Sequence, residues 1–255
     1  MKKALLTALL VLILSSQAFA GAGEADRLFQ EGNEAYRNGT YQKAIECYLK
    51  ITAIQQVASP QLYYNLGNAY FRDNKLGYAI LYYEKAHRLL PRDRDIAFNL
   101  EFAREAAQKA GAPEGKEGAS ILSLASINEV TVAVFLLWWG LVALIILYVF
   151  LKKEQYLWAL CTVAILFLMG TALMATAIYQ REYQQSGIIT APSAEVHSSP
   201  SLQEAISVII PEGTKVRILR TEEDWVEVAV QGQKDNASTG GPIQGWIPAK
   251  DIKSL

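Results

Sequence analysis

The stretch Tyr63–Ile80, YYNLGNAYFRDNKLGYAI, holds the pattern that decides the fold of the N-terminal half. Asp73-Asn74 marks a turn between two helical patterns. Gly67 lies before this turn and Ala79 after it, and residues this small let two antiparallel helices touch. The large residues before the turn recur at intervals of three and four, the spacing of one helix face: Tyr63, Leu66 and Tyr70. The stretch therefore predicts a closely packed helical hairpin.

The same pattern occurs once upstream, where EGNEAYRNGTYQKAIECYLKI parallels LGNAYFRDNKLGYAILYYEKA. Gly32 lies 35 residues before Gly67, and Ala44 lies 35 residues before Ala79. A fixed period of about 34 residues indicates stacked helical repeats. The order of small and large residues resembles the tetratricopeptide repeat.

The resemblance covers both copies, and the second copy fits the repeat more closely. In the first copy Glu31 and Ala35 stand where a large apolar and an aromatic residue are usual, whereas Pro91 closes the second copy as expected. A further helical pattern from Arg94 to Lys109 can cover the last face of the array, which would otherwise be exposed. The sequence predicts an all-α domain over residues 21–110, with two repeats and a capping helix.

The resemblance implies a concave groove lined by the inner helix of each repeat and by the capping helix. Asn33 and Asn68 match asparagines with which some family members hold the terminal carboxylate of a peptide, but phenylalanines replace the basic residues that those members pair with them. Aromatic and arginine side chains suit a protein segment, although each aromatic can instead be core between helices. The predicted groove residues are Phe29, Asn33, Tyr36, Arg37, Tyr64, Asn68, Phe71, Arg72, Phe98 and Phe102.

Residues 1–20 have the composition of a signal peptide. Two lysines precede a short apolar run, and the segment ends in Ala18-Phe19-Ala20, a small-x-small cleavage site. The run is too short to prefer spanning a bilayer. We therefore expect the mature chain to start at Gly21, outside the cytoplasm, the alternative being an uncleaved anchor.

Two long segments without a charged residue predict a membrane hairpin. Lys152 and Lys153 lie in the short loop between them, and only Arg181 follows the second segment, so the loop is expected in the cytoplasm and both soluble regions in the periplasm. Small residues around Gly170 suit packing within the hairpin or against a partner helix. The expected bounds are a linker over 111–129, transmembrane helices over 130–151 and 156–179, and a loop over 152–155.

Residues 187–255 change to the alternating pattern of short strands. KVRILR and WVEVAV place Val216, Ile218, Val226, Val228 and Val230 on one face. The order of AEVHSSPS, IPEGTKVRIL, DWVEV and GWIPAKDI resembles the bacterial SH3-like domain, a small all-β barrel. Such modules often bind cell wall or peptides, and Trp225 and Trp246 can form a stacking surface or lie half-buried in the barrel.

Composition disfavours several classes of function. The net charge of −1 argues against a nucleic-acid partner. Two cysteines, Cys47 and Cys161, and two histidines, His87 and His197, are too few and too scattered for a disulfide framework or a metal site. No cofactor is expected. The sequence shows no nucleophile with a neighbouring base, the pattern that would indicate an enzyme.

The order of signal, tetratricopeptide pair, two-helix membrane hairpin and SH3-like barrel resembles the BatE-like family of the bacterial aerotolerance operon. This resemblance implies an inner-membrane protein of a cell-envelope complex, with membrane partners that carry von Willebrand factor A domains. We expect a non-enzymatic scaffold whose two soluble domains bind protein partners. The alternative is an anchor or sensor that contacts peptidoglycan through the SH3-like domain.

Overall fold

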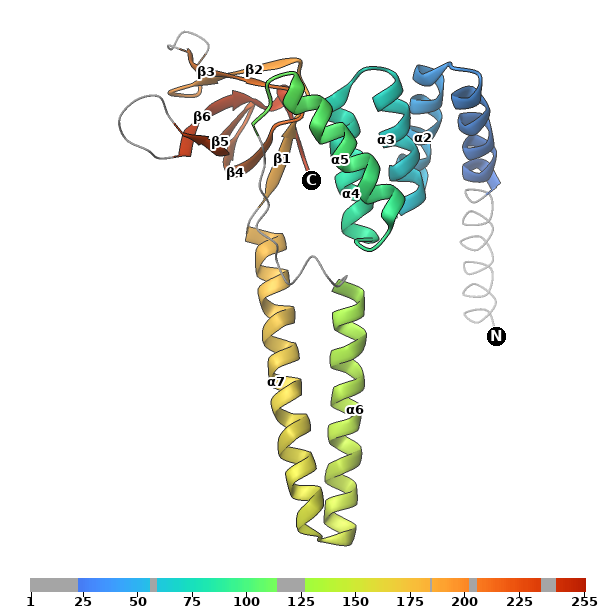
Figure 1. Cartoon of the computed structure of the whole chain (residues 1–255), viewed down its shortest axis with the longest axis vertical. Helices are drawn as coiled ribbons and strands as arrows, with labels where there is room; N and C mark the ends of the chain where they lie inside the picture. Colours follow the sequence, from blue (N-terminus) through green and yellow to red (C-terminus); the bar gives the residue numbers. More distant parts are fainter. Residues whose placement is uncertain (1–22, 56–58, 114–126, 184, 202–205, 235–241) are drawn as a thin grey trace, which may run out of the picture.

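The computed structural model describes residues 23–55, 59–113, 127–183, 185–201, 206–234 and 242–255. The expected signal peptide and most of the expected linker lie outside the described residues. Figure 1 shows three parts, which we call the helical stack, the apolar hairpin and the β domain. The helical stack and the β domain lie side by side at the same end of the apolar hairpin.

The helical stack begins with a helix over residues 23–37, and each later helix packs against the one before it. Local capping fixes two of the helix starts, because the side chains of Ser59 and Asp93 accept hydrogen bonds from backbone N–H groups of the first turns that follow. The capping helix has the predicted bounds. The remaining helices of the stack are α2 (Tyr41–Gln55), α3 (Pro60–Arg72), α4 (Leu76–Leu89) and α5 (Arg94–Lys109).

In each repeat a tyrosine of the second helix lies on a glycine of the first helix. A Cβ atom on Gly32 would lie 2.6 Å from Cε1 of Tyr48, and one on Gly67 would lie 2.5 Å from Cδ1 of Tyr83. Ordinary carbon contacts need about 3.5–4.0 Å, so any side chain at either position would displace the ring. Both tyrosines are buried. The glycines therefore recur with the repeat because they set the distance between its two helices.

Gly67→Ala is expected to destabilise the protein, because the added methyl group collides with the ring of Tyr83. Overpacking of this kind lowers the free energy of unfolding by about 1–3 kcal/mol. The better helix propensity of alanine offsets less than about 1 kcal/mol of this loss. Thermal unfolding of the full chain in detergent, followed by near-ultraviolet circular dichroism, measures the change. Gly23→Ala is the control, because nothing lies within 4 Å of the added atom. A midpoint for Gly67→Ala at or above that of the unaltered chain would contradict this packing.

The apolar hairpin consists of α6 (Ile127–Leu151) and α7 (Glu154–Tyr183), and both helices are longer than expected. Each extends beyond the uncharged segments over 130–151 and 156–179. The loop shortens correspondingly from residues 152–155 to Lys152 and Lys153. Charged residues are compatible with a helix, so the ends of an uncharged segment do not mark where the helix itself ends.

Both helices of the apolar hairpin are long and apolar enough to cross a membrane. Mean hydropathy reaches 2.7 over Glu129–Leu151 and 2.2 over Tyr156–Thr176. The two helices approach closely at Gly170, where a Cβ atom would lie 3.1 Å from Cγ2 of Val134 on α6. Gly170 thus contributes to packing within the hairpin, one of the two uses expected for its small-residue patch.

The β domain is a single antiparallel sheet with strand order β3-β2-β6-β5-β4-β1-β7. Val216 pairs with Val230 and Ile218 with Val228 across β4 and β5, and these side chains belong to the core of the domain or pack against it, as the alternation predicted. The strands are β1 (Ser186–Ile189), β2 (Ser193–His197), β3 (Ile206–Pro211), β4 (Lys215–Glu222), β5 (Trp225–Lys234), β6 (Pro242–Pro248) and β7 (Ile252–Ser254), with the short helix η2 (Ala249–Asp251) before β7.

The β domain packs directly against the helical stack. Ile188 of β1 is fully buried in the same apolar cluster as the core of the stack, and Leu255 packs against that cluster. The backbones meet at Gly77 of α4, where a Cβ atom would collide with the backbone of Ile189 and Thr190. The two parts therefore share a core and approach each other as closely as the helices within a repeat do.

The β domain also supplies a cap for α4. Lys75, at the N-cap position of this helix, makes no side-chain hydrogen bond to it. Instead, the backbone N–H of Gly77 donates to Oε2 of Glu212, 3.2 Å away. A carboxylate at this end satisfies an otherwise unpaired N–H group and meets the positive end of the helix dipole. Glu212 stabilises this helix from 135 residues away in the chain.

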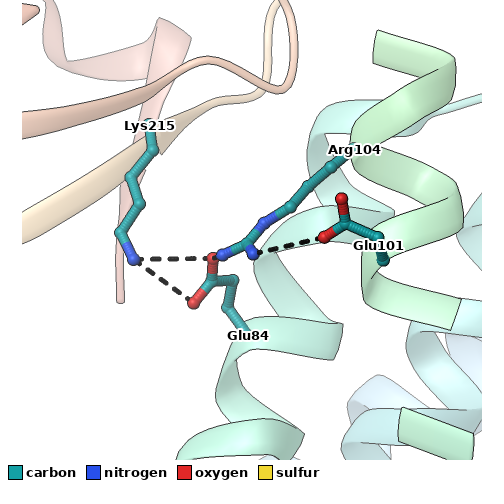
Figure 2. A network of polar contacts seen from close by, with 4 residues as sticks. All are labelled: Glu84, Glu101, Arg104 and Lys215. Atoms are coloured by element: carbon teal, nitrogen blue, oxygen red, sulfur yellow. Dashed lines mark hydrogen bonds and ion pairs between the residues drawn. The ribbon is translucent and has the colours of Figure 1, made fainter. Parts of the chain in front are cut away.

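A buried carboxylate joins the helical stack to the β domain, as Figure 2 shows. Glu84 of α4 is 3% exposed and accepts a hydrogen bond from Arg104 of α5, while Nζ of Lys215 on β4 lies 3.4 Å from its Oε2. Burial alone would raise the pKa of Glu84, but Lys215 and Arg104 outweigh it and hold the pKa below its ordinary value. For Lys215, burial outweighs the attraction of Glu84 and lowers the pKa. The carboxylate is thus the firmly charged centre of the contact.

Glu84→Gln is expected to weaken the docking of the β domain by about 2–4 kcal/mol, because two partly buried cations lose their anion. The folded-state pKa of Glu84 lies below the ordinary value of a glutamate, so its contribution is complete above that ordinary value and is lost as pH falls through the folded-state pKa. Urea unfolding of the full chain across this acid range measures both effects.

The matched control is Glu46→Gln, which removes an exposed carboxylate from α2. It should unfold like the unaltered chain at every pH. Equal stability of Glu84→Gln and the unaltered chain, with the same acid profile, would show that this ion pair contributes nothing to docking.

Candidate functional site

Two adjoining cavities run along the helical stack and share Tyr36 and Asn68; together we call them the groove. The larger cavity has a volume of about 380 Å³ and is lined by Tyr36, Tyr64, Asn68, Phe71, Arg72, Tyr83, Phe98, Asn99 and Phe102. The smaller has a volume of about 160 Å³ and is lined by Asn33, Tyr36, Arg37, Tyr48, Asn65 and Asn68. The groove thus extends over both repeats and the capping helix.

Each repeat joins its two helices through one asparagine and one tyrosine. The hydroxyl of Tyr48 donates to Oδ1 of Asn33 at 2.8 Å, and that of Tyr83 donates to Oδ1 of Asn68 at 2.7 Å. Burial raises the pKa of Tyr48 to about 12 and also raises the pKa of Tyr83. Both hydroxyls therefore stay protonated at neutral pH and remain donors. The tyrosines that lie on the glycines also orient the asparagines of the groove.

A second pair of asparagines completes the amide network of the groove. Asn65 donates to Oδ1 of Asn33 at 3.4 Å. Asn99 donates to Oδ1 of Asn68 at 3.2 Å and to the hydroxyl of Tyr64 at 2.8 Å. An asparagine amide carries two N–H donors besides its oxygen. Because internal donors satisfy Oδ1 of Asn33 and Asn68, the groups that these two residues can offer a ligand are N–H donors.

Phenylalanines form one wall of the larger cavity, at its capping-helix side. The ring centroids of Phe71 and Phe102 are 5.5 Å apart, and those of Phe98 and Phe102 are 6.4 Å apart. Phe98 is 70% exposed and Phe102 is 51% exposed. Neighbouring exposed aromatic side chains beside a cavity are typical of binding sites, because covering them with an apolar group removes their surface from water.

Two arginines border the groove, one in each cavity. The Nε–H of Arg72 donates to the hydroxyl of Tyr41 at 3.2 Å, and its guanidinium lies 5.6 Å from the centre of that ring. Arg37 is exposed and lines the smaller cavity. The groove therefore combines aromatic surface, amide donors and positive charge.

The structure brings the predicted groove residues together, with the exception of Phe29. The ring of Phe29 packs against Tyr48, with centroids 6.1 Å apart, and contacts the core of the stack. Several groove aromatics also pack partly against that core, so the two uses predicted for them coexist. The sequence prediction missed Tyr48, Asn65, Tyr83 and Asn99, although Asn65 and Asn99 are 34 residues apart and follow the repeat period.

The structure buries one of the two tryptophans proposed as alternatives for a stacking surface, Trp246, and leaves Trp225 half-buried. Trp246 is only 9% exposed and pairs with His197 across β2 and β6. Trp225 is half-buried, with the ring of His197 packed edge-on at 5.4 Å. The position of Trp246 fits the alternative of a tryptophan packed within the β domain, because its side chain is almost fully covered.

Within the part of the chain that the structure describes, no group of three or more His, Cys, Asp or Glu residues could hold a metal ion. Cys47 is buried in the stack and Cys161 lies on the surface of the apolar hairpin. Burial raises the pKa of Cys47, which keeps it a thiol and makes it a poor nucleophile. The described residues of the groove offer a ligand aromatic contacts and hydrogen-bond donors.

Comparison with known proteins identifies one element of this architecture. Residues 60–93 match the family model of the tetratricopeptide repeat. Among solved structures, the first TPR of Spaghetti (RPAP3) bound to HSP90 peptide SRMEEVD shares 21% identity, with 33% of this chain and 93% of that chain covered and a TM-score of 0.23. No curated protein matches the chain. The segment that contains α3 and α4 is thus a tetratricopeptide repeat, a module that suggests protein–protein interaction.

Proposed function

We propose that this protein is a membrane-anchored adaptor whose groove binds an extended segment of a partner protein. The observation that carries this proposal is the exposed pair Phe98 and Phe102 beside a cavity of about 380 Å³ that also presents amide donors. A partner's apolar side chain would cover the phenylalanines, and its backbone carbonyls would accept from Asn33 and Asn68. Aromatic and arginine side chains dominate the anchors of protein interfaces.

The proposed role is binding rather than catalysis, and the placement is a two-pass inner-membrane protein. Lys152 and Lys153 at the tip of the apolar hairpin favour a cytoplasmic tip, which would put the stack and the β domain in the periplasm. The two soluble parts lie together at the other end of the hairpin, which suits this placement (Figure 1). The resemblance to the BatE-like family favours a cell-envelope complex and a von Willebrand factor A-domain membrane protein as the partner.

Removal of the two exposed phenylalanines, Phe98 and Phe102, should weaken binding without affecting folding. Peptides selected from a random library displayed on phage, with the full chain in detergent as bait, provide the ligand, and fluorescence anisotropy measures its affinity. Phe98→Ala combined with Phe102→Ala should weaken binding at least about 30-fold, the effect of losing one interface hot spot. Thermal unfolding should change little, because both side chains are more than half exposed.

A matched control removes the same kind of surface elsewhere. Ile206 and Ile209 of β3 are 49% and 57% exposed, and replacing both by alanine should leave the affinity unchanged. Selected peptides that bind the phenylalanine double variant as tightly as the unaltered chain would place the binding site outside the groove.

The membrane placement predicts a specific pattern of proteolysis. In intact spheroplasts, added protease should cleave both the stack and the β domain, whereas the tip at Lys152 and Lys153 should become accessible only after the membrane is permeabilised. Antibodies against each soluble part and an epitope tag at the tip report the fragments. Protection of either soluble part in intact spheroplasts would refute the proposed orientation.

A further inference from the structure

We infer that the β domain positions the groove: Lys215 and Glu212 act through α4 as positioning residues for the ligand. This inference rests on the proposed binding function. The β domain would then contribute to ligand binding in the groove, although it does not line the groove.

Consecutive residues of α4 belong to the groove and to the domain contact. Tyr83 lines the larger cavity, lies on Gly67 and donates to Asn68. The next residue is Glu84, which is buried and held by Lys215 of β4. Neighbouring residues project about 100° apart around a helix, so one turn of α4 presents both contacts. A rotation or shift of α4 at Glu84 would move the hydroxyl that orients Asn68.

The capping helix α5 repeats this arrangement. Asn99 and Phe102 line the larger cavity, and Arg104, two residues further on, donates to Glu84. Figure 2 shows that Arg104 and Lys215 approach this carboxylate from separate elements. Near the end of α5, Ala107 lies against Gly213 of the β domain: a Cβ atom there would be 2.8 Å from that of Ala107. The β domain therefore holds both α5, which carries Phe98 and Phe102, and α4, which carries the hydroxyl of Tyr83.

This support matters because a repeat array is stabilised by contacts between neighbours, and α4 and α5 are the last helices of the stack. Glu212 accepts from the N–H of Gly77 and so holds the start of α4, while Lys215 holds its middle at Glu84. A groove whose walls are fixed before the ligand arrives binds more tightly, because less conformational entropy is lost on binding. Docking of the β domain and occupation of the groove should then favour each other by the same factor, since linkage is reciprocal.

Affinity for the phage-selected peptide tests the first half of this linkage, with the full chain in detergent. Lys215→Met keeps the length of the side chain and removes its charge, and should weaken binding at least about fivefold. Lys215→Arg, which keeps the charge, should restore the affinity. Lys250→Met is the control, because this lysine is exposed on η2. If Lys215→Met lowers the content of β structure in circular dichroism, Glu212→Gln replaces it as the test, because it only removes the charge of the cap of α4.

Hydrogen exchange tests the reciprocal half. Without peptide, Lys215→Met should speed exchange in α4 and α5 while the helix over residues 23–37 exchanges as before. With peptide bound to the unaltered chain, β1 and β4 should exchange more slowly, although they do not line the groove. The inference is overturned if peptide binds Lys215→Met and Glu212→Gln as tightly as the unaltered chain, or if exchange in α4, α5, β1 and β4 stays the same. Failure to select any peptide would count against the proposed function, and exchange in Lys215→Met would still decide the inference.

Discussion

The contact of a tyrosine ring with a bare glycine backbone is the constraint on which the helical stack depends. Gly32 and Gly67 allow Tyr48 and Tyr83 to lie so close that no side chain fits between. The same tyrosines donate hydrogen bonds to the asparagines of the groove. One tyrosine in each repeat therefore sets both the distance between the helices and the orientation of an asparagine. Because protein interiors are densely packed, such a contact does not tolerate even one added methylene group. The glycine and the tyrosine therefore occur in both repeats, whereas many surface residues differ between them.

The second organising feature is that the chain returns to its own helical stack after passing through the apolar hairpin. Residues far apart in sequence meet at Glu84, where a carboxylate from α4 neutralises cations from α5 and β4. An isolated buried carboxylate would be costly, and two cations make it tolerable. The result is a groove whose last two helices, α4 and α5, are held by the β domain. The β domain thus supports helices of a groove that it does not itself line.

Local and periodic features were readable from the sequence, whereas contacts between distant segments were not. The glycine and alanine spacing predicted the repeats, α5 has the predicted bounds, and valine alternation predicted one face of β4 and β5. Most of the groove followed from placing the repeat pattern on the chain. The ion pair between Glu84 and Lys215 could not be predicted, because these residues are 131 positions apart and each looks like an ordinary surface charge. Trp246 shows the same limit, because composition gives no sign of which way a strand tryptophan faces.

The cap that Glu212 provides for α4 has a consequence for the order of events during biosynthesis. The ribosome makes α4 first, then both helices of the apolar hairpin, and only afterwards the segment that contains Glu212. Until that segment arrives, the start of α4 lacks its acceptor and the edge of the stack stays uncovered. A nascent chain would therefore complete the support of its groove only after both helices of the apolar hairpin have been synthesised. The groove would then be complete only in chains whose β domain has been synthesised and has docked on the stack.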